Sequence, residues 1–248
     1  MGYALVSDHR PEGRKRRYRP PHDVRSTSLG TLLGEIGRPN LEDDQLPFLG
    51  AGKGAPVELF YSGSIDLLKQ PAIAIVGARD VSEAGAARAR RLSRELSEAG
   101  VTIVSGLAKG VDVNAHRSAI SAGGATVAVI GTSLSQAYPA EHAELQEDIA
   151  ERHLLISPFP EGSRVFPSNF PKRNRVMAAV SDGSAIIEAS DTSGTLHQAV
   201  ECQKLGRWLF ILRAVAEDSK LTWPAKFIGK PKVVVVSSTQ EILDALAR

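Results

Sequence analysis

The chain has 248 residues, of which 42% are hydrophobic and 23% charged, and its formal net charge is +2. This composition supports a full hydrophobic core and excludes a chain that is disordered throughout. The single cysteine, Cys202, excludes a disulfide framework and a cysteine-cluster zinc site. Apolar runs are only strand-sized and the basic N-terminus lacks an apolar core, so we expect a soluble cytoplasmic protein without a membrane span.

Basic side chains are concentrated in the first 25 residues, which hold seven Lys and Arg against three Asp and Glu. Because Pro and Gly interrupt residues 1–55, we expect a basic N-terminal extension, in part disordered, with room for a short helix near 29–36. Its basic run, 14–19, could grip nucleic acid, but an extended solvated tail is the commoner meaning of such a run. Residues 56–248 are expected to form the folded domain.

From residue 56 onward, strand-like runs alternate with helix-like ones. We predict strands at 72–76, 102–105, 125–130, 154–157, 184–188, 208–212 and 232–236. We predict helices at 84–99, 112–122, 139–151, 172–180, 194–205 and from 238 onward. Single helices between strands imply right-handed crossovers. The fold is therefore predicted to be α/β, with an open, doubly wound, mostly parallel sheet.

Glycines follow three of the early predicted strands, at Gly77, Gly106 and Gly131. In such sheets ligands bind beyond the carboxyl ends of the strands, where glycine lets backbone N–H groups approach an anion. The alternative is that each glycine only forms a tight turn. Neither a P-loop nor a dinucleotide fingerprint is present, and Arg79 stands where the fingerprint would have its second glycine. This favours a charged contact to a phosphate over a nicotinamide cofactor site.

Cations and aromatic rings are interleaved over residues 162–176. The segment holds Arg164, Phe166, Phe170, Lys172, Arg173, Asn174 and Arg175. Cations pair with the phosphates of an unpaired strand while its bases stack on rings. Alternatively the phenylalanines anchor the core, which we favour for Phe170 taken alone, and the arginines form a solvated helix face. For the cations we favour function, and we expect Arg79 and Arg175 on one rim.

No catalytic or metal-ligating arrangement is predicted. His116 lies four residues after Asp112 on a predicted helix, but a helix cap and a structural histidine are commoner than a catalytic pair. The histidines have no ligand spacing, and no G-x-S-x-G is present. We assign phosphate-loop roles to Gly77, Gly131, Gly194 and Thr195. We expect no cofactor and no metal.

Several segments share order and spacing with one known family. They include AIAIVGAR (72–79), VSGLAKGVDVNAH (104–116), FPKRNR (170–175) and IEASDTSGT (187–195). Over about 150 residues the chain resembles the DprA/Smf family of DNA-processing proteins. The resemblance implies an extended Rossmann-like domain that binds single-stranded DNA without sequence preference and is not an enzyme. It further implies protection of incoming strands, loading of a RecA-type recombinase in natural transformation, and a homodimer.

Carried over residue by residue, the resemblance assigns DNA contact to the first strand's arginine, the glycine loop and the basic motif. The nucleic-acid-binding residues are then Arg79, Ser105, Gly106, Lys109, Phe170, Lys172, Arg173, Asn174 and Arg175. The chain departs from the family pattern after Arg207, and a relative working in defence against foreign DNA is conceivable. The alternative function is a binder of a nucleotide-like small molecule or a phosphoribohydrolase-type enzyme, whose G-G-x-G-T segment Ser193–Thr195 matches in part.

Overall fold

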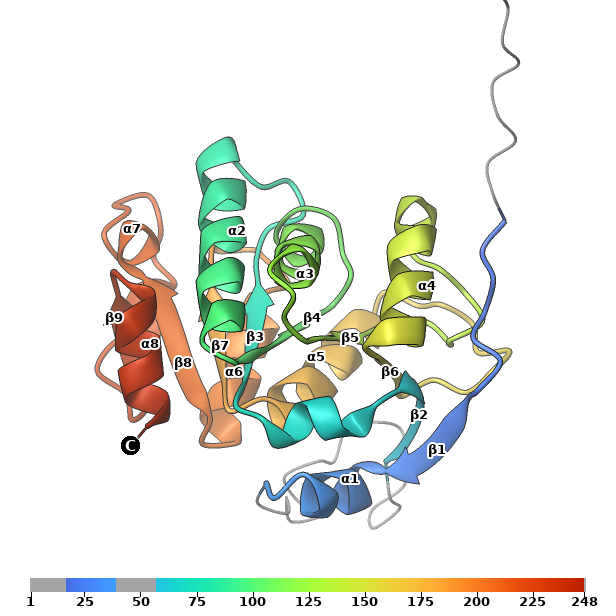
Figure 1. Ribbon diagram of the computed structural model, residues 1–248. Helices are drawn as coiled ribbons and strands as arrows, with labels where there is room; N and C mark the ends of the chain where they lie inside the picture. The colour runs from blue at the N-terminus through green and yellow to red at the C-terminus, as the bar shows by residue number, and fades with distance from the viewer. Residues whose placement is uncertain (1–16, 39–56, 248) are drawn as a thin grey trace, which may run out of the picture.

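A single nine-stranded sheet organises the computed structural model, which describes residues 17–38 and 57–247 (Figure 1). Its order is β1-β2-β6-β5-β4-β3-β7-β8-β9. The strands are β1 (Arg25–Ser28), β2 (Glu58–Gly63), β3 (Ala72–Val76), β4 (Thr102–Ser105), β5 (Thr126–Val129), β6 (Leu154–Ser157), β7 (Gly183–Ile186), β8 (Trp208–Leu212) and β9 (Val233–Val236).

The strands from β3 to β9 are all parallel, with β4, β5 and β6 on one side of β3 and β7, β8 and β9 on the other. Ala74 lies opposite Val104 on one side and Ser184 on the other. The chain therefore winds outward twice from β3, which confirms the predicted doubly wound sheet. The antiparallel strands β1 and β2 extend it beyond β6.

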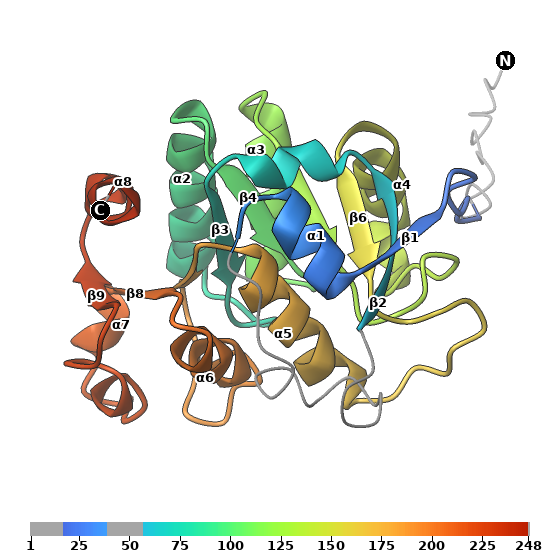
Figure 2. The same ribbon diagram turned by 90° about the horizontal axis from the view of Figure 1, so that it is seen from below.

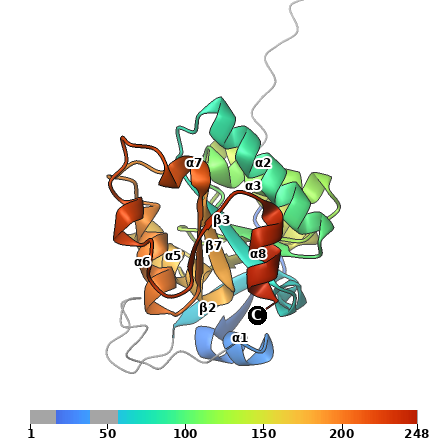
Figure 3. The same cartoon turned by 90° about the vertical axis from the view of Figure 1, so that its left-hand side faces the viewer.

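Helices cover both faces of the sheet. The α-helices are α1 (Leu29–Glu35), α2 (Glu83–Glu98), α3 (Val111–Ser121), α4 (Ala143–Arg152), α5 (Asn169–Val180), α6 (Leu196–Lys204), α7 (Arg213–Ala216) and α8 (Thr239–Leu246). Short 3₁₀ segments add η1 (Ile65–Lys69), η2 (Ala140–His142) and η3 (Pro224–Lys226). Figure 3 shows α5 and α6 on one side of the sheet and α2, α3 and α8 on the other.

The alternation of side chains along β3 explains this two-sided burial. Ala72, Ala74 and Val76 pack with α1, α5 and α6, whereas Ile73 and Ile75 pack with α2, α3 and α8. Figure 2 shows α5 and α6 below the sheet, with α1 in front of it. A strand buried on both faces reads as an unbroken apolar run, which is why these strands were predictable.

One boundary matters for the site. The helix predicted at 172–180 begins three residues earlier, so α5 starts at Asn169. Pro171 lies in its first turn, where the missing N–H has no partner in any helix, so proline does not stop it. Phe170 therefore lies on the first turn of α5 rather than in the preceding loop.

The sequence did not predict the strand pair β1 and β2. The N-terminal region supplies β1 to the sheet and α1 to its covering layer. Ser28 caps α1 by accepting from the Thr31 amide, and Leu29, Leu32 and Leu33 enter the core, so the short apolar helix expected near 29–36 is present. Tyr18 also contacts the loop that follows β5, donating to the Leu134 carbonyl at 2.8 Å. Residues 14–16 of the basic run and the stretch 39–56 lie outside the described residues, so the division at residue 56 stays a prediction.

Among the described residues, no helix is long and apolar enough to cross a membrane.

Candidate nucleic-acid interface

The candidate site lies beyond the carboxyl ends of β3, β4 and β7. Because β4 and β7 flank β3 on opposite sides, the chain reverses its direction of winding here, and ligands of open α/β sheets bind at such points. A cavity of about 300 Å³ opens there, and we call it the switch-point groove. Its lining includes Gly77, Arg79, Asp112, Phe170, Arg173, Asn174, Ser193, Gly194 and Thr195.

Arg173 is the buried cation of the groove. It extends from α5 with 5% of its surface exposed, and its Nη1 donates to the Val129 carbonyl at 2.7 Å. Its Nε is buried without a hydrogen-bond partner in the described chain. Burial lowers the pKa of Arg173, while the nearby Asp112 carboxylate opposes that shift. A buried guanidinium with unused donors favours an anionic ligand beside it.

Gly106 makes room for this guanidinium. A Cβ atom at position 106 would lie 1.3 Å from Arg173 Nη1, so only glycine fits against it. The amide of Gly106 donates to Asp112 Oδ2 at 3.1 Å, and that carboxylate also accepts from the Ala108 amide. This amide does face an anion, but the anion is the Asp112 carboxylate of the protein rather than a bound phosphate. Burial raises the pKa of Asp112, and the positive charge of Arg173 opposes the rise.

Arg79, Phe170 and Tyr138 form a stack at the mouth of the groove. The Arg79 Cζ lies 5.0 Å from the Phe170 ring centroid, and the Tyr138 ring centroid lies 5.5 Å from it at 42°. Tyr138 is 44% exposed. A second, smaller cavity of about 60 Å³ adjoins this stack and is lined by Arg79, Lys109, Gly131, Tyr138 and Phe170, among others. Rings beside cations can hold an unstacked base and its phosphate.

Two of the phosphate-loop glycines are explained by close packing. Gly131 faces Phe170, where a Cβ atom would lie 2.9 Å from the ring, and Gly77 faces Val111 at 2.5 Å. Thr195 donates from its hydroxyl to the Gly77 carbonyl at 3.1 Å, which ties the β7 loop to the β3 loop. At Gly194 an added Cβ would meet nothing within 4 Å.

Three predicted residues lie away from the groove. Ser105 is fully buried and donates to the Ile75 carbonyl at 2.6 Å, so its hydroxyl holds β4 to β3. Arg175 lies two residues after Arg173, which on a helix is nearly the opposite face, and its Nε lies 3.2 Å from Glu201 Oε1 on α6. The expectation that Arg79 and Arg175 share one rim is therefore wrong. Lys172 is half-buried and lines neither cavity.

Lys109 and Tyr138 lie beside the smaller cavity. Lys109 lines the small cavity, but its ammonium is 3.0 Å from Glu141 and remains 55% exposed. Tyr138 lines the same cavity but was not predicted as a site residue. The available signal was an aromatic residue in the loop after Gly131, at the edge where the glycines gather.

His116 and Asp112 do not form a catalytic pair. His116 is fully buried, and its Nδ1 lies 2.7 Å from the Thr126 hydroxyl, whereas the Asp112 carboxylate accepts from the loop amides. Burial lowers the pKa of His116 to about 3, so the ring stays neutral. Both side chains therefore have structural roles. Within the described ranges, no group of His, Cys, Asp and Glu is arranged to hold a metal ion.

A family model described as DNA recombination-mediator protein A matches residues 41–247. The chain belongs to this family. It is 42% identical over 189 residues to the DNA processing protein DprA of Streptococcus pneumoniae, covering 76% of this chain and 66% of that protein. It is 34% identical to protein Smf of Escherichia coli, covering 81% of this chain and 54% of that protein. The chain thus spans only part of the length of these relatives.

Two solved structures of DprA proteins are also similar to this chain. The X-ray structure of DprA from S. pneumoniae is 35% identical with a TM-score of 0.72, covering 90% of this chain and 74% of that one. DNA processing protein A from Helicobacter pylori, reported for its single-stranded DNA binding mode, is 28% identical with a TM-score of 0.69, covering 78% and 89%. A molybdenum cofactor carrier protein from Chlamydomonas reinhardtii shares the fold alone. It is 18% identical with a TM-score of 0.51, and the match covers 72% of this chain and 99% of that one.

Proposed function

We propose that this protein binds single-stranded DNA without sequence preference across the switch-point groove. The observation that carries the proposal is the placement of Arg79, Phe170 and Arg173 around one opening. The exposed Arg79 and Lys109 would neutralise phosphates, Arg173 would hold a phosphate at the bottom of the groove, and a base would stack on Phe170 or Tyr138. The single-stranded DNA binding reported for the H. pylori relative supports the same ligand.

The geometry favours an unpaired strand over a duplex. In a duplex the bases are already stacked on one another and their faces are not available to protein rings. A cavity of about 300 Å³ with aromatic and cationic walls has room for a group the size of a base, which only a flexible strand can insert. Contacts to phosphates and ring faces carry no base code, so the binding is expected to tolerate any sequence.

The test is a titration of a labelled oligothymidylate and a duplex of equal length, at two salt concentrations. Tight binding of the single strand with weak binding of the duplex is expected. Arg79→Ala should weaken binding and reduce the single-strand salt slope by about 0.7, the share of one phosphate. Arg152→Ala is the matched control, since the Arg152 side chain is 64% exposed, forms an ion pair with Asp148 and precedes β6 at the amino edge of the sheet, opposite the groove. Equal losses in both variants would contradict the proposal.

We further propose that the protein is not an enzyme and works in the cytoplasm with a RecA-type recombinase, as a homodimer, on strands entering by natural transformation. Membership of the recombination-mediator family supports this setting. Light scattering of the purified chain tests the dimer. Recombinase assembly on oligonucleotides, with and without this protein, tests the loading role, and no stimulation would contradict it.

A phosphoribohydrolase-type reaction has less support. Glu188, the acidic residue at the end of the β7 segment, accepts from the Ser82 amide at 3.0 Å and from the Ser82 hydroxyl at 2.6 Å. Its carboxylate therefore holds the start of α2 rather than standing free for a substrate. Incubation with nucleoside monophosphates tests this alternative, and release of free base would replace the proposal above.

A further inference from the structure

A second polar cavity lies at the amino ends of the parallel strands, on the opposite edge from the switch-point groove. It has a volume of about 370 Å³ and we call it the basal pocket. Its polar walls come from the residues that precede or begin β3, β7, β8 and β9, together with the end of the α1 segment. The side chains that line it include Arg38, Lys69, Asp182, Arg207, Trp208 and Lys232. Neither the proposed DNA contacts nor the family comparison assigns this pocket a role.

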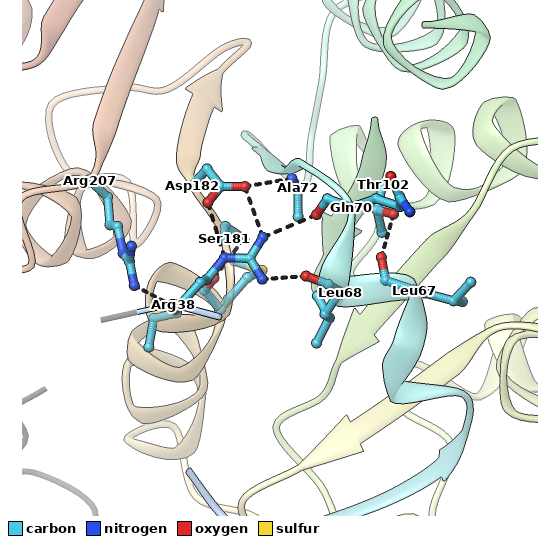
Figure 4. A network of polar contacts seen from close by, with 11 residues as sticks. Arg38, Leu67, Leu68, Gln70, Ala72, Thr102, Ser181, Asp182 and Arg207 are labelled. Atoms are coloured by element: carbon cyan, nitrogen blue, oxygen red, sulfur yellow. Dashed lines mark hydrogen bonds and ion pairs between the residues drawn. The ribbon is translucent and has the colours of Figure 1, made fainter. Parts of the chain in front are cut away.

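On one wall of the pocket, the charged side chains already have hydrogen-bond partners within the protein. Arg38 donates to both Asp182 carboxylate oxygens, at 3.1 and 2.8 Å, and to the Leu68 and Gln70 carbonyls (Figure 4). Asp182 also accepts from the Ala72 amide at 2.8 Å. This bracket joins the α1 segment to the starts of β3 and β7, and it uses the donors of Arg38 and the charge of Asp182. Neither residue is then left to bind a ligand.

Arg207 is not satisfied in this way. Only 8% of its surface is exposed, and its Nη2 donates to the Ala179 carbonyl at 3.0 Å. Its Nε is buried without a hydrogen-bond partner in residues 17–38 and 57–247. A guanidinium has five N–H donors, and those of a buried one are normally paired. Figure 4 shows Arg207 apart from the Arg38–Asp182 bracket, so that carboxylate does not supply the missing partner.

Lys232 is held at the pocket in an uncommon conformation. Its φ of 56° lies in the left-handed region, although Lys232 is not glycine. This conformation accompanies an ammonium that donates to the Gly206 carbonyl at 2.8 Å and lies 5.9 Å from the Trp208 ring centroid. Unfavourable backbone conformations persist where the surrounding structure holds them, and they concentrate at ligand sites.

The charges of the lining define the ligand. Arg38 is matched by Asp182, and Lys69 by Asp66 at 2.6 Å. Within residues 17–38 and 57–247, neither Arg207 nor Lys232 forms an ion pair, and Asp182 acts on Arg207 only through longer-range attraction. A phosphomonoester carries between about 1.5 and 2 negative charges near neutral pH, whereas a carboxylate carries one. The volume exceeds that of a phosphate group alone and falls at the lower end of the range for small-molecule sites.

We propose that the basal pocket binds a phosphomonoester, with Arg207 and Lys232 holding its phosphate. The group could come from a free mononucleotide or from the 5′-phosphate of a DNA strand, because both present the same dianion. Internal phosphodiesters carry a single charge and are expected to bind more weakly here. Since the pocket and the switch-point groove lie at opposite edges of the sheet, a small ligand in the pocket does not compete directly with DNA in the groove.

The test titrates the full chain with inorganic phosphate, with thymidine 5′-monophosphate, and with short oligonucleotides that carry or lack a 5′-phosphate. The readout is the intrinsic fluorescence of Trp208, which lines the pocket and is one of two tryptophans. A saturable change with phosphate and a tighter one with the monophosphate are expected. A response to the 5′-phosphorylated oligonucleotide beyond that to its 5′-hydroxyl form would identify a strand end as the source. The absence of a fluorescence change with every phosphomonoester would overturn the proposal.

Variants test whether the fluorescence change arises from binding in the basal pocket. Arg207→Gln should weaken binding of the monophosphate about tenfold or more, the effect of losing a charged hydrogen bond. If Arg207→Gln does not fold, Lys232→Gln, at an exposed position, should still weaken binding severalfold. Lys230→Gln is the matched control, since Lys230 contacts the Phe227 ring and does not line the pocket. Unchanged affinity in Lys232→Gln, or loss of the signal in Arg79→Ala, would overturn the proposal, the latter by placing the ligand in the switch-point groove.

Discussion

The guanidinium carbon of Arg79 lies 5.0 Å from the centre of the Phe170 ring, which joins the loop after β3 to the first turn of α5. These two residues are about ninety positions apart in the chain, and they meet because β3 is the central one of the parallel strands while α5 packs against its face. The contact places a cation and a ring at one mouth of the switch-point groove. A phosphate and its base could therefore be held by neighbouring groups.

This pair leads to a first prediction. Phe170→Leu keeps an apolar side chain against Gly131 but removes the stacking surface, so it should weaken single-stranded DNA binding by about 1–3 kcal/mol. Arg79→Lys keeps the charge and loses the planar group, and it should bind better than Arg79→Ala. Fluorescence anisotropy with a labelled oligonucleotide measures both. Wild-type affinity in Phe170→Leu would exclude stacking on this ring.

Gly106 supports a second prediction. Gly106→Ala introduces a methyl group onto Arg173, so it should destabilise the fold by about 1–3 kcal/mol and displace the guanidinium from the groove. Gly194→Ala is the control, because a methyl group there meets nothing within 4 Å and should change stability by less than about 0.5 kcal/mol. Urea unfolding measures both. Equal stability of the two variants would contradict the close packing at Gly106.

Stability should fall in acid because of His116. Its pKa is about 3 in the folded protein and near 6.5 when unfolded, so between these values the unfolded chain binds more protons. The free energy of unfolding should therefore decrease as pH falls below about 6.5, by up to about 1.4 kcal/mol per pH unit from this group. Urea unfolding at pH 7 and pH 5.5 measures the slope. His116→Gln should reduce it, and an unchanged slope would assign it to other groups.

The Arg38–Asp182 bracket supports a prediction on the N-terminal region. Arg38→Ala leaves the Asp182 carboxylate without its cation and two backbone carbonyls without their donor, at a cost of about 2–4 kcal/mol in unfolding free energy. Arg25→Ala is a milder comparison, because the contacts of Arg25 with Asp23, the Gly63 carbonyl and the Tyr61 ring lie at an exposed side chain, and an exposed ion pair is worth at most about 1 kcal/mol. Thermal unfolding distinguishes them. A cost no greater than that of Arg25→Ala would mean that the bracket contributes little.

The central strands were predictable because each is an apolar run buried on both faces, as in 72–76, and because Gly100 and Ser238 mark helix ends. The glycines at the ends of these strands also predicted a binding site at the carboxyl edge of the sheet, where the candidate groove lies. What could not be predicted is the direction of each side chain. The cations of 172–175 are adjacent in sequence, but α5 turns Arg173 into the groove and Arg175 toward Glu201. Likewise β1 and β2 pair through sequence-distant contacts that no local pattern marks.

Because Arg79 is exposed and Arg173 is buried, we expect them to act on different rates of DNA binding, those of association and dissociation. Charges in open solvent attract a polyanion from a distance and are screened by salt, whereas a desolvated cation acts only once the strand is seated. On the proposed function, Arg79→Ala should slow capture most at low ionic strength. Arg173→Gln should instead shorten the residence time, and stopped-flow kinetics would resolve the two effects. We therefore expect the exposed arginine to govern the first encounter with a DNA strand and the buried arginine to govern how long the strand stays bound.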